Sequence, residues 1–153
     1  MNYWLMKSEP STFGIDDLAK APRHRSHWDG VRNYQARNML RDEMKKGDLA
    51  FFYHSSCEVP GIYGIVKIVR EGYPDPTAFD PRHAHFDPKS DAAAPTWYMV
   101  DVALERRFAA PLTLEKLKAN ARALGDLVVL RRGNRLSITP VTAMQWRKVL
   151  ALA

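Results

Sequence analysis

Residues 28–34 (WDGVRNY) combine a large aromatic side chain with a glycine turn and with polar side chains that begin an expected helix. Gly30 allows the backbone to approach a ligand closely, and free N–H groups at a helix start attract an anion such as phosphate. Trp28, Arg32 and Asn33 therefore suit a site for a base and its phosphate. The alternative is that Trp28 is a core residue and Gly30 only turns the chain.

A second group of chemically capable residues lies in residues 3–10 (YWLMKSEP). Lys7, Ser8 and Glu9 offer a cation, a hydroxyl and a carboxylate where an expected strand ends. The alternative is that Lys7 and Glu9 form a solvent-exposed ion pair, which contributes at most about 1 kcal/mol. The three groups also suit a small amidohydrolase, but successive strand residues point to opposite faces, so we expect that they do not share one pocket.

Residues 51–57 (FFYHSSC) lead from alternating aromatic side chains into a turn rich in hydroxyl groups. Tyr53 and Ser55 share one face of the expected strand and His54 lies on the other, and we expect one of these faces to be core. His54 and Cys57 would form a nucleophilic pair only if the thiolate met an oriented base. Closeness in sequence does not supply that geometry, so we expect no catalytic residue here.

The histidines have no metal-site spacing with carboxylates, and a structural zinc takes four ligands. We therefore expect neither a metal nor another cofactor. The five histidines are His24, His27, His54, His83 and His85.

Aromatic side chains interleave with polar ones along the chain. Such sets build pockets in which stacking contributes about 1–3 kcal/mol per base and hydrogen bonds read the base edge. Aromatic-rich cores use the same residue types. The set consists of Trp4, Trp28, Tyr34, Tyr53 and Trp97 with Lys7, Arg32, Asn33 and Ser55.

The composition is that of a soluble globular protein with an excess of positive charge. There are 23 Lys+Arg and 17 Asp+Glu, a net charge of +6, which suits a polyanionic partner such as nucleic acid. The single cysteine indicates a reducing compartment, the cytoplasm of a bacterium or the nucleus of a eukaryote. We find no signal-peptide pattern and no run approaching about 18 apolar residues, so we expect no membrane partner.

The elements that must position these residues form a mixed pattern. Alternating apolar residues predict six strands, and amphipathic spacing predicts four helices, the last capped by Thr139 and Pro140. Residues 73–95 hold five of the 10 prolines and predict a long ordered flap. We expect one α+β domain over residues 1–153, a small curled barrel with helices at its edges. The strands are expected at 3–7, 48–55, 61–70, 96–108, 127–131 and 136–138, and the helices at 15–20, 33–46, 113–120 and 139–152.

Read in order, these motifs resemble the EVE domain family. The resemblance covers nearly the whole chain, and residues 28–38 (WDGVRNYQARN) are its most specific part. Ser56 is a departure, because close relatives often have Asn at this position. The other matching pieces are residues 4–10 (WLMKSEP), 51–55 (FFYHS), 60–62 (PGI), 73–75 (YPD), 86–88 (FDP), 97–102 (WYMVDV) and 135–138 (RLSI).

The resemblance implies a PUA-like pseudobarrel of about five or six mostly antiparallel strands with flanking helices. It also implies a non-enzymatic reader of modified bases, in which a flipped-out 5-modified cytosine of DNA, such as 5-methylcytosine, enters an aromatic-lined pocket. The alternatives are an amidohydrolase of the related ASCH type that acts on acylated nucleosides, and an RNA-binding module. The oligomeric state stays open, with a monomer the simplest expectation.

The resemblance also suggests roles for single residues. It implies pocket walls at Trp28 and Tyr53, edge recognition by Asn33 and Ser55, and polar contacts near the mouth from Lys7, Ser8 and Arg32. Trp4 is expected to support the pocket or to lie behind it.

Overall fold

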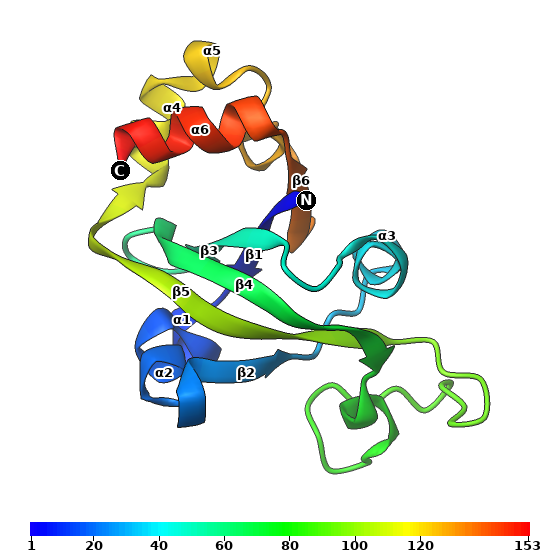
Figure 1. Ribbon diagram of the computed structural model, residues 1–153. Helices are drawn as coiled ribbons and strands as arrows, with labels where there is room; N and C mark the ends of the chain where they lie inside the picture. Colours follow the sequence, from blue (N-terminus) through cyan, green and yellow to red (C-terminus); the bar gives the residue numbers. More distant parts are fainter.

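Six strands form one sheet at the centre of the computed structural model, which describes residues 1–153. Their order in the sheet is β2-β5-β4-β3-β1-β6, and all neighbours are antiparallel except β1 and β3. This arrangement, with helices on both sides, confirms the expected α+β fold (Figure 1). The strands are β1 (Tyr3–Ser8), β2 (Arg25–Trp28), β3 (Leu49–His54), β4 (Gly61–Pro74), β5 (Tyr98–Thr113) and β6 (Ile138–Val141).

Short helices cover the two faces of the sheet. In Figure 1, α1 and α2 lie on one side of it and α4, α5 and α6 on the other. None of these helices is long and apolar enough to cross a bilayer. The helices are α1 (Pro10–Phe13), α2 (Ile15–Lys20), α3 (Tyr34–Asn38), α4 (Leu114–Ala119), α5 (Ala121–Leu124) and α6 (Ala143–Leu152).

The central strands β1 and β3 are buried on both faces. Phe52 belongs to a core beneath α2, whereas its neighbours Phe51 and Tyr53 belong to a second core beneath α4 to α6. Successive side chains of a strand point to opposite faces, so one strand serves both cores. We expected one of the two faces of residues 51–57 to be core, and the structure makes both faces core, because helices cover the sheet on both sides.

The C-terminal part of the chain differs from expectation in two places. Val128–Leu130 is a 3-10 turn rather than a strand. Thr139 and Pro140 do not begin the last helix but pair with β1 as part of β6. Proline is tolerated there because β6 is an edge strand. Thr142 caps α6 instead, since its hydroxyl accepts a hydrogen bond from the Gln145 amide at 3.1 Å.

The region that leads to the site also differs from the sequence pattern. Strand β2 was not foreseen, because it is a short edge strand with exposed polar side chains. The expected helix 33–46 is α3 followed by a π-helical turn, Met39–Glu43, after which Met44 is already extended. Gly47, with φ +97°, therefore turns the chain four residues after Glu43, the last helical residue, and does not cap the helix.

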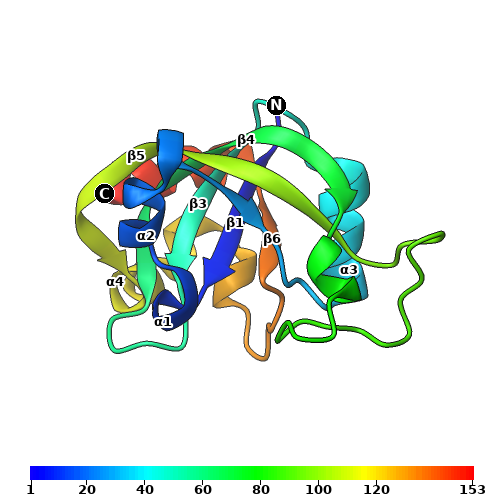
Figure 2. The ribbon, with the colours of Figure 1, turned by 90° about the horizontal axis from the view of Figure 1, so that it is seen from below.

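The proline-rich segment 75–97 joins β4 to β5. It contains one 3-10 turn, Pro76–Phe79, and an isolated bridge between Asp91 and Ala94. Figure 2 shows it extending from the sheet next to α3. This segment, called the flap below, begins two residues later than expected because β4 continues to Pro74.

Candidate functional site

A cavity of about 530 Å³ lies where the most specific sequence motif meets the end of β1. We call it the Trp28 cavity. Its lining comes from β1, α1, β2, the loop after β2, the flap and Ser137 next to β6. Four stretches that are distant in sequence therefore meet at one opening: residues 7–13, 26–32, 83–85 and 137.

Trp28 and Phe13 provide most of the apolar wall of this cavity. Trp28 is 6% exposed, and its ring meets the ring of Phe52 edge-on at a centroid distance of 5.4 Å. The ring of Phe13 lies 6.4 Å from Phe52 on the same core. Trp28 is thus both a core residue and a cavity wall, so the two interpretations of this residue are compatible.

The backbone at Gly30 lies close to another group, as we expected, but that group is His85 of the flap rather than a ligand. Gly30 has a φ of +78°, and a Cβ atom at this position would lie 2.6 Å from the imidazole of His85. Its amide donates a hydrogen bond to Asp75 Oδ2 at 2.9 Å. The glycine therefore lets the flap close over the loop after β2.

Arg32 borders the cavity, but the protein itself occupies its donors. Nε and Nη2 donate to the carbonyl of His85 at 3.0 and 2.8 Å, and Nη1 donates to Asp75 Oδ2 at 3.0 Å. Nη2 also donates to Thr77 Oγ1 at 3.1 Å. Arg32 therefore holds the flap, and the structure leaves it no free donor for the expected contact at the mouth.

Asp75 receives these contacts at a fully buried position. Burial raises the pKa of its carboxyl group, but hydrogen bonds from Thr77, the Gly30 amide and Arg32 outweigh it and lower the pKa below its usual value. The carboxylate is therefore held charged inside the flap.

Asn33 does not reach the cavity. It is the N-cap of α3, where its Oδ1 accepts a hydrogen bond from the Ala36 amide at 3.0 Å. Asn is a preferred residue at this position because it satisfies a free amide of the first turn. The expectation that Asn33 reads a base edge in a pocket shared with Trp28 is therefore wrong.

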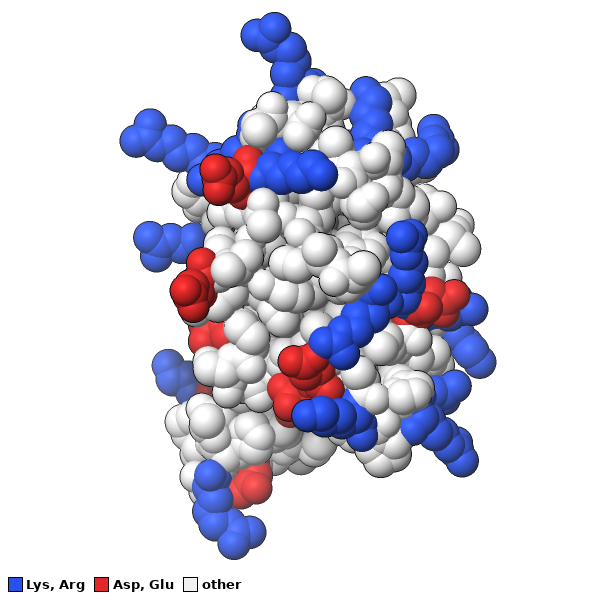
Figure 3. All heavy atoms as spheres, turned by 90° about the vertical axis from the view of Figure 1, so that its left-hand side faces the viewer, with Lys and Arg blue, Asp and Glu red and all other residues white.

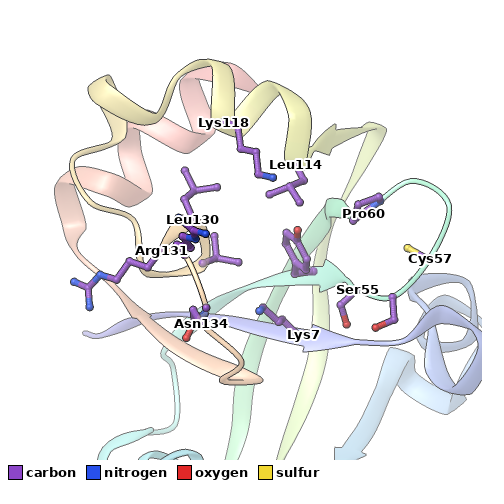
Figure 4. A pocket seen from close by; sticks show the side chains of 14 residues that line it. Lys7, Ser55, Cys57, Pro60, Leu114, Lys118, Leu130, Arg131 and Asn134 are labelled. Atoms are coloured by element: carbon purple, nitrogen blue, oxygen red, sulfur yellow. The ribbon is translucent and has the colours of Figure 1, made fainter.

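Tyr53 and Ser55 lie at a second cavity of about 510 Å³, which we call the Tyr53 cavity. Tyr53 follows Phe52 in β3, and Phe52 packs against Trp28, so the Tyr53 side chain points to the other face of the sheet. The expectation of one pocket between Trp28 and Tyr53 is therefore wrong. Figure 4 shows the second cavity between β3, β1 and α4, with Ser55 at one side.

Lys7 borders both cavities. Its ammonium group makes no ion pair or hydrogen bond in the structure. Burial lowers the pKa of Lys7 below its usual value. This side chain is therefore an available donor at the wall between the two cavities.

Ser8 and Glu9 line the Trp28 cavity together with Lys7. The prediction that these three residues do not share a pocket is wrong, because β1 ends at Ser8 and Glu9 already belongs to the turn into α1. The Ser8 hydroxyl donates a hydrogen bond to the carbonyl of Phe13 at 2.6 Å.

Trp4 borders neither cavity. It is 3% exposed in the same core as Trp28, and its Nε1 donates to Asp48 Oδ2 at 3.1 Å. The structure places it behind the site, one of the two positions expected for it.

His54 is a core residue rather than part of a nucleophilic pair. Its Nε2 accepts a hydrogen bond from the Ile15 amide at 3.1 Å, and its ring stacks on Tyr63 at 3.8 Å. Burial lowers the pKa of His54. Cys57 lines the Tyr53 cavity instead.

Sequence reasoning missed several lining residues of both cavities. The flap gave a signal in its two closely spaced histidines, but only the fold brings them to Gly30. The loop before β6 gave a signal only in the family match at residues 135–138, to which no role was assigned. The missed residues are Thr12, Ser26, His83, His85 and Ser137 at the Trp28 cavity, and Lys118, Arg131, Arg132 and Asn134 at the Tyr53 cavity.

The charges around the Trp28 cavity nearly balance. Its lining includes the carboxylates of Glu9 and Asp29 and the cations Lys7 and Arg32, and Arg32 is paired with Asp75. Figure 3 likewise shows acidic and basic side chains next to one another on one face of the molecule. Such a cavity suits a neutral polar group better than an anion.

Comparisons with known proteins agree with this architecture. The EVE domain profile matches residues 2–152. Thymocyte nuclear protein 1 of Danio rerio is 48% identical over 165 residues, which cover 97% of this chain and 71% of that protein. A crystal structure from Pseudomonas putida has a TM-score of 0.92 and 50% identity, with 98% of each chain covered.

The structure of the human THYN1 protein in complex with DNA that contains 5-methylcytosine is similar as well. It has a TM-score of 0.93 and 45% identity, and the match covers 99% of this chain and 97% of that one. Matches of this extent and identity establish a common family. The chain belongs to the EVE domain family.

Proposed function

We propose that residues 1–153 form one EVE domain that binds DNA and reads a 5-modified cytosine in the Trp28 cavity. The observation that carries this proposal is the similarity over 99% of the chain to the human THYN1 protein, whose structure holds DNA with 5-methylcytosine. The most specific family motif, residues 28–38, contributes Trp28, Gly30 and Arg32 to the lining of the cavity.

The shape and chemistry of the cavity support a flipped base. The cavity has a volume of about 530 Å³. A base that is stacked in a duplex cannot enter such a cavity, so the base would have to leave the stack. Extruding it costs a few kcal/mol. Trp28 and Phe13 supply apolar contact, and the hydroxyl groups of Thr12, Ser26 and Ser137 supply hydrogen bonds. The nearly balanced charge of the lining favours a neutral base.

The proposed role of Lys7 and Ser8 follows from their position. Both lie at the end of β1 on the rim of the cavity, where Lys7 has a free ammonium group and the Ser8 hydroxyl can still accept a hydrogen bond. Ser8 is fixed by its bond to Phe13, so it would orient a base. Asp29, exposed on the same lining, is a further candidate for edge contacts.

The preference for a modified base should be modest. One buried methyl group contributes about 0.8 kcal/mol, which is roughly fourfold in Kd. Most of the affinity would come from Lys and Arg contacts to phosphates, so binding should weaken with salt in proportion to the phosphates contacted.

The direct test is fluorescence anisotropy at fixed salt with duplexes that differ in one central cytosine. The unmodified, 5-methyl, 5-hydroxymethyl and 5-formyl forms are compared, and an RNA duplex of the same sequence is included. The proposal expects tighter binding of at least one modified DNA. Equal affinity for all DNA forms would leave only a basic surface, and a preference for RNA would overturn the assignment to DNA.

Variants of the cavity locate the site. Trp28→Phe removes part of the apolar surface that a base would contact, and Asp29→Asn removes the charge of an exposed lining group. Each variant should therefore reduce the preference for the modified base. Trp146→Phe is the matched control, because Trp146 is 4% exposed in the other core and borders neither cavity. A loss of preference in Trp146→Phe equal to that in Trp28→Phe would contradict the assignment.

The shared lining by Lys7, Ser8 and Glu9 is the observation that keeps an amidohydrolase as the second candidate. Binding is favoured because the Ser8 hydroxyl already donates to a backbone carbonyl. Incubation with N4-acetylcytidine separates the two. Release of cytidine that is abolished in Lys7→Ala would establish the enzyme and overturn the proposal of binding alone.

A further inference from the structure

We propose that the Tyr53 cavity is a binding site for a phosphate group. It lies on the opposite face of the sheet from most of the Trp28 cavity, and the proposed function does not use it. The site needs only a phosphate anion, so the inference stands without the proposed function. If that function holds, the anion would be a backbone phosphate of the bound strand.

The charge of the lining is the first argument. Among the 14 residues that line the cavity four are Lys or Arg and none is Asp or Glu. Arg131 is paired with Asp126 at 2.9 Å, and Figure 4 shows its side chain pointing away from the cavity. Lys7, Lys118 and Arg132 have no ion pair in the structure. Three cations without a counterion thus belong to the lining of one hollow.

The positions of these cations are the second argument. Figure 4 shows Lys118 extending from α4 towards the cavity and Lys7 entering it from β1, with Asn134 beside Lys7. The cations therefore come from different elements and approach from different sides. An anion between them would be contacted by several donors at once, which charge-assisted hydrogen bonds favour.

Uncharged donors without partners are the third argument. The Nδ2 atom of Asn134 is buried and has no hydrogen-bond partner, although an unpartnered buried donor costs about 1–3 kcal/mol. The Tyr53 hydroxyl makes no hydrogen bond within the protein either. Burial, followed by the nearby Cys57, raises the pKa of Tyr53 to about 12, so this phenol stays protonated and can donate.

The apolar part of the lining strengthens this attraction. Leu114, Val129 and Leu130 belong to the lining of the cavity. Apolar walls exclude water and lower the local dielectric constant, so each charge interacts more strongly with a bound anion. The Trp28 cavity differs, because carboxylates there offset its cations.

The first experiment titrates inorganic phosphate into the full chain, with chloride at equal ionic strength as the reference. Binding is followed by NMR of the backbone amides and of the Asn134 side-chain amide. We expect saturable shifts around the cavity with Kd on the order of 1 mM. Shifts no larger than those in chloride would overturn the proposal.

Variants test whether the cavity holds the anion. Lys118→Gln and Arg132→Gln each remove one charge-assisted contact, worth about 1.4 kcal/mol, so phosphate binding should weaken about tenfold. Arg122→Gln is the matched control, because Arg122 is exposed on α5, has no ion pair and does not line the cavity. Equal weakening in the three variants would overturn the proposal, since it would indicate only the overall charge.

A DNA arm distinguishes the source of the phosphate. If the site takes a backbone phosphate, Lys118→Gln should lower the affinity for an unmodified DNA duplex. It should also reduce the slope of log affinity against log salt concentration by about one. If DNA binding is unchanged while phosphate binding is weakened, the site takes a free phosphate or a small phosphorylated ligand. Trp28→Phe should leave phosphate binding intact, so failure of this site and failure of the base-reading proposal are distinguishable.

Discussion

The guanidinium of Arg32 and the carboxylate of Asp75 lie 3.0 Å apart and join two segments 43 residues apart in the sequence. Asp75 is fully buried, and Arg32 also holds the carbonyl of His85. This pair connects the loop after β2 to the flap, so the shape of the Trp28 cavity depends on it.

Arg32→Gln should destabilise the protein by about 3 kcal/mol, because it leaves a buried carboxylate without its cation. The measurement is the free energy of unfolding from urea denaturation. Arg82→Gln is the control, since Arg82 is 93% exposed and lies 3.8 Å from Asp80. A loss no larger than that of the control would show that the pair does not hold the flap.

Gly30→Ala should lower the free energy of unfolding more than Gly133→Ala does. A Cβ at Gly30 would lie 2.6 Å from the His85 ring, whereas a Cβ at Gly133 meets nothing within 4 Å. The two glycines have φ of +78° and +76°, so both alanines bear a similar backbone cost of about 1–2 kcal/mol. The extra destabilisation of Gly30→Ala, measured by urea unfolding, isolates the contact with His85. Equal losses would contradict it.

Ser56→Gly should stabilise the protein by up to about 1 kcal/mol, because Ser56 has φ +52° in the left-handed region. Ser56→Asn should stabilise it by less, since Asn tolerates this region better than Ser. This backbone requirement explains why Asn suits the position without any contact to a base. Ser56 lines the Tyr53 cavity, so neither variant should change the preference among cytosine forms. A changed preference would place the base there.

His54 should make stability depend on pH. Burial lowers its pKa in the folded state below the unfolded value of about 6.5, so the unfolded chain binds more protons as the pH falls. The stability that neutral His54 contributes is fully present above the unfolded pKa. It is lost as the pH decreases through the lower pKa of the folded state. His54→Gln keeps an acceptor for the Ile15 amide without a titrating group. Its free energy of unfolding should fall less between pH 7.5 and pH 5 than that of the unchanged chain; an equal fall would exclude His54 as the cause.

Much of the fold was predictable because its central strands are strongly patterned. Strands β1 and β3 to β5 appear in the sequence as runs of β-branched and aromatic residues, and the motif at residues 28–38 indicates the family. The edge strands were harder. Strand β2 has exposed polar residues and β6 contains a proline, so local patterns at Arg25 and Pro140 do not favour a strand. Pairing with β5 and β1 forms them instead.

The sequence by itself determined which residue types are available: the aromatic, hydroxyl and basic side chains, the net charge of +6 and the family motif. Only the tertiary structure decided how they are grouped. Helices cover both faces of the sheet, so Phe52 and Tyr53, adjacent in β3, enter different cores. Trp28 packs against Phe52 and lines one cavity, whereas Tyr53 and Ser55 line the other. The physical reason is that neighbouring side chains of a strand point in opposite directions, and which face each cavity occupies depends on contacts distant in sequence.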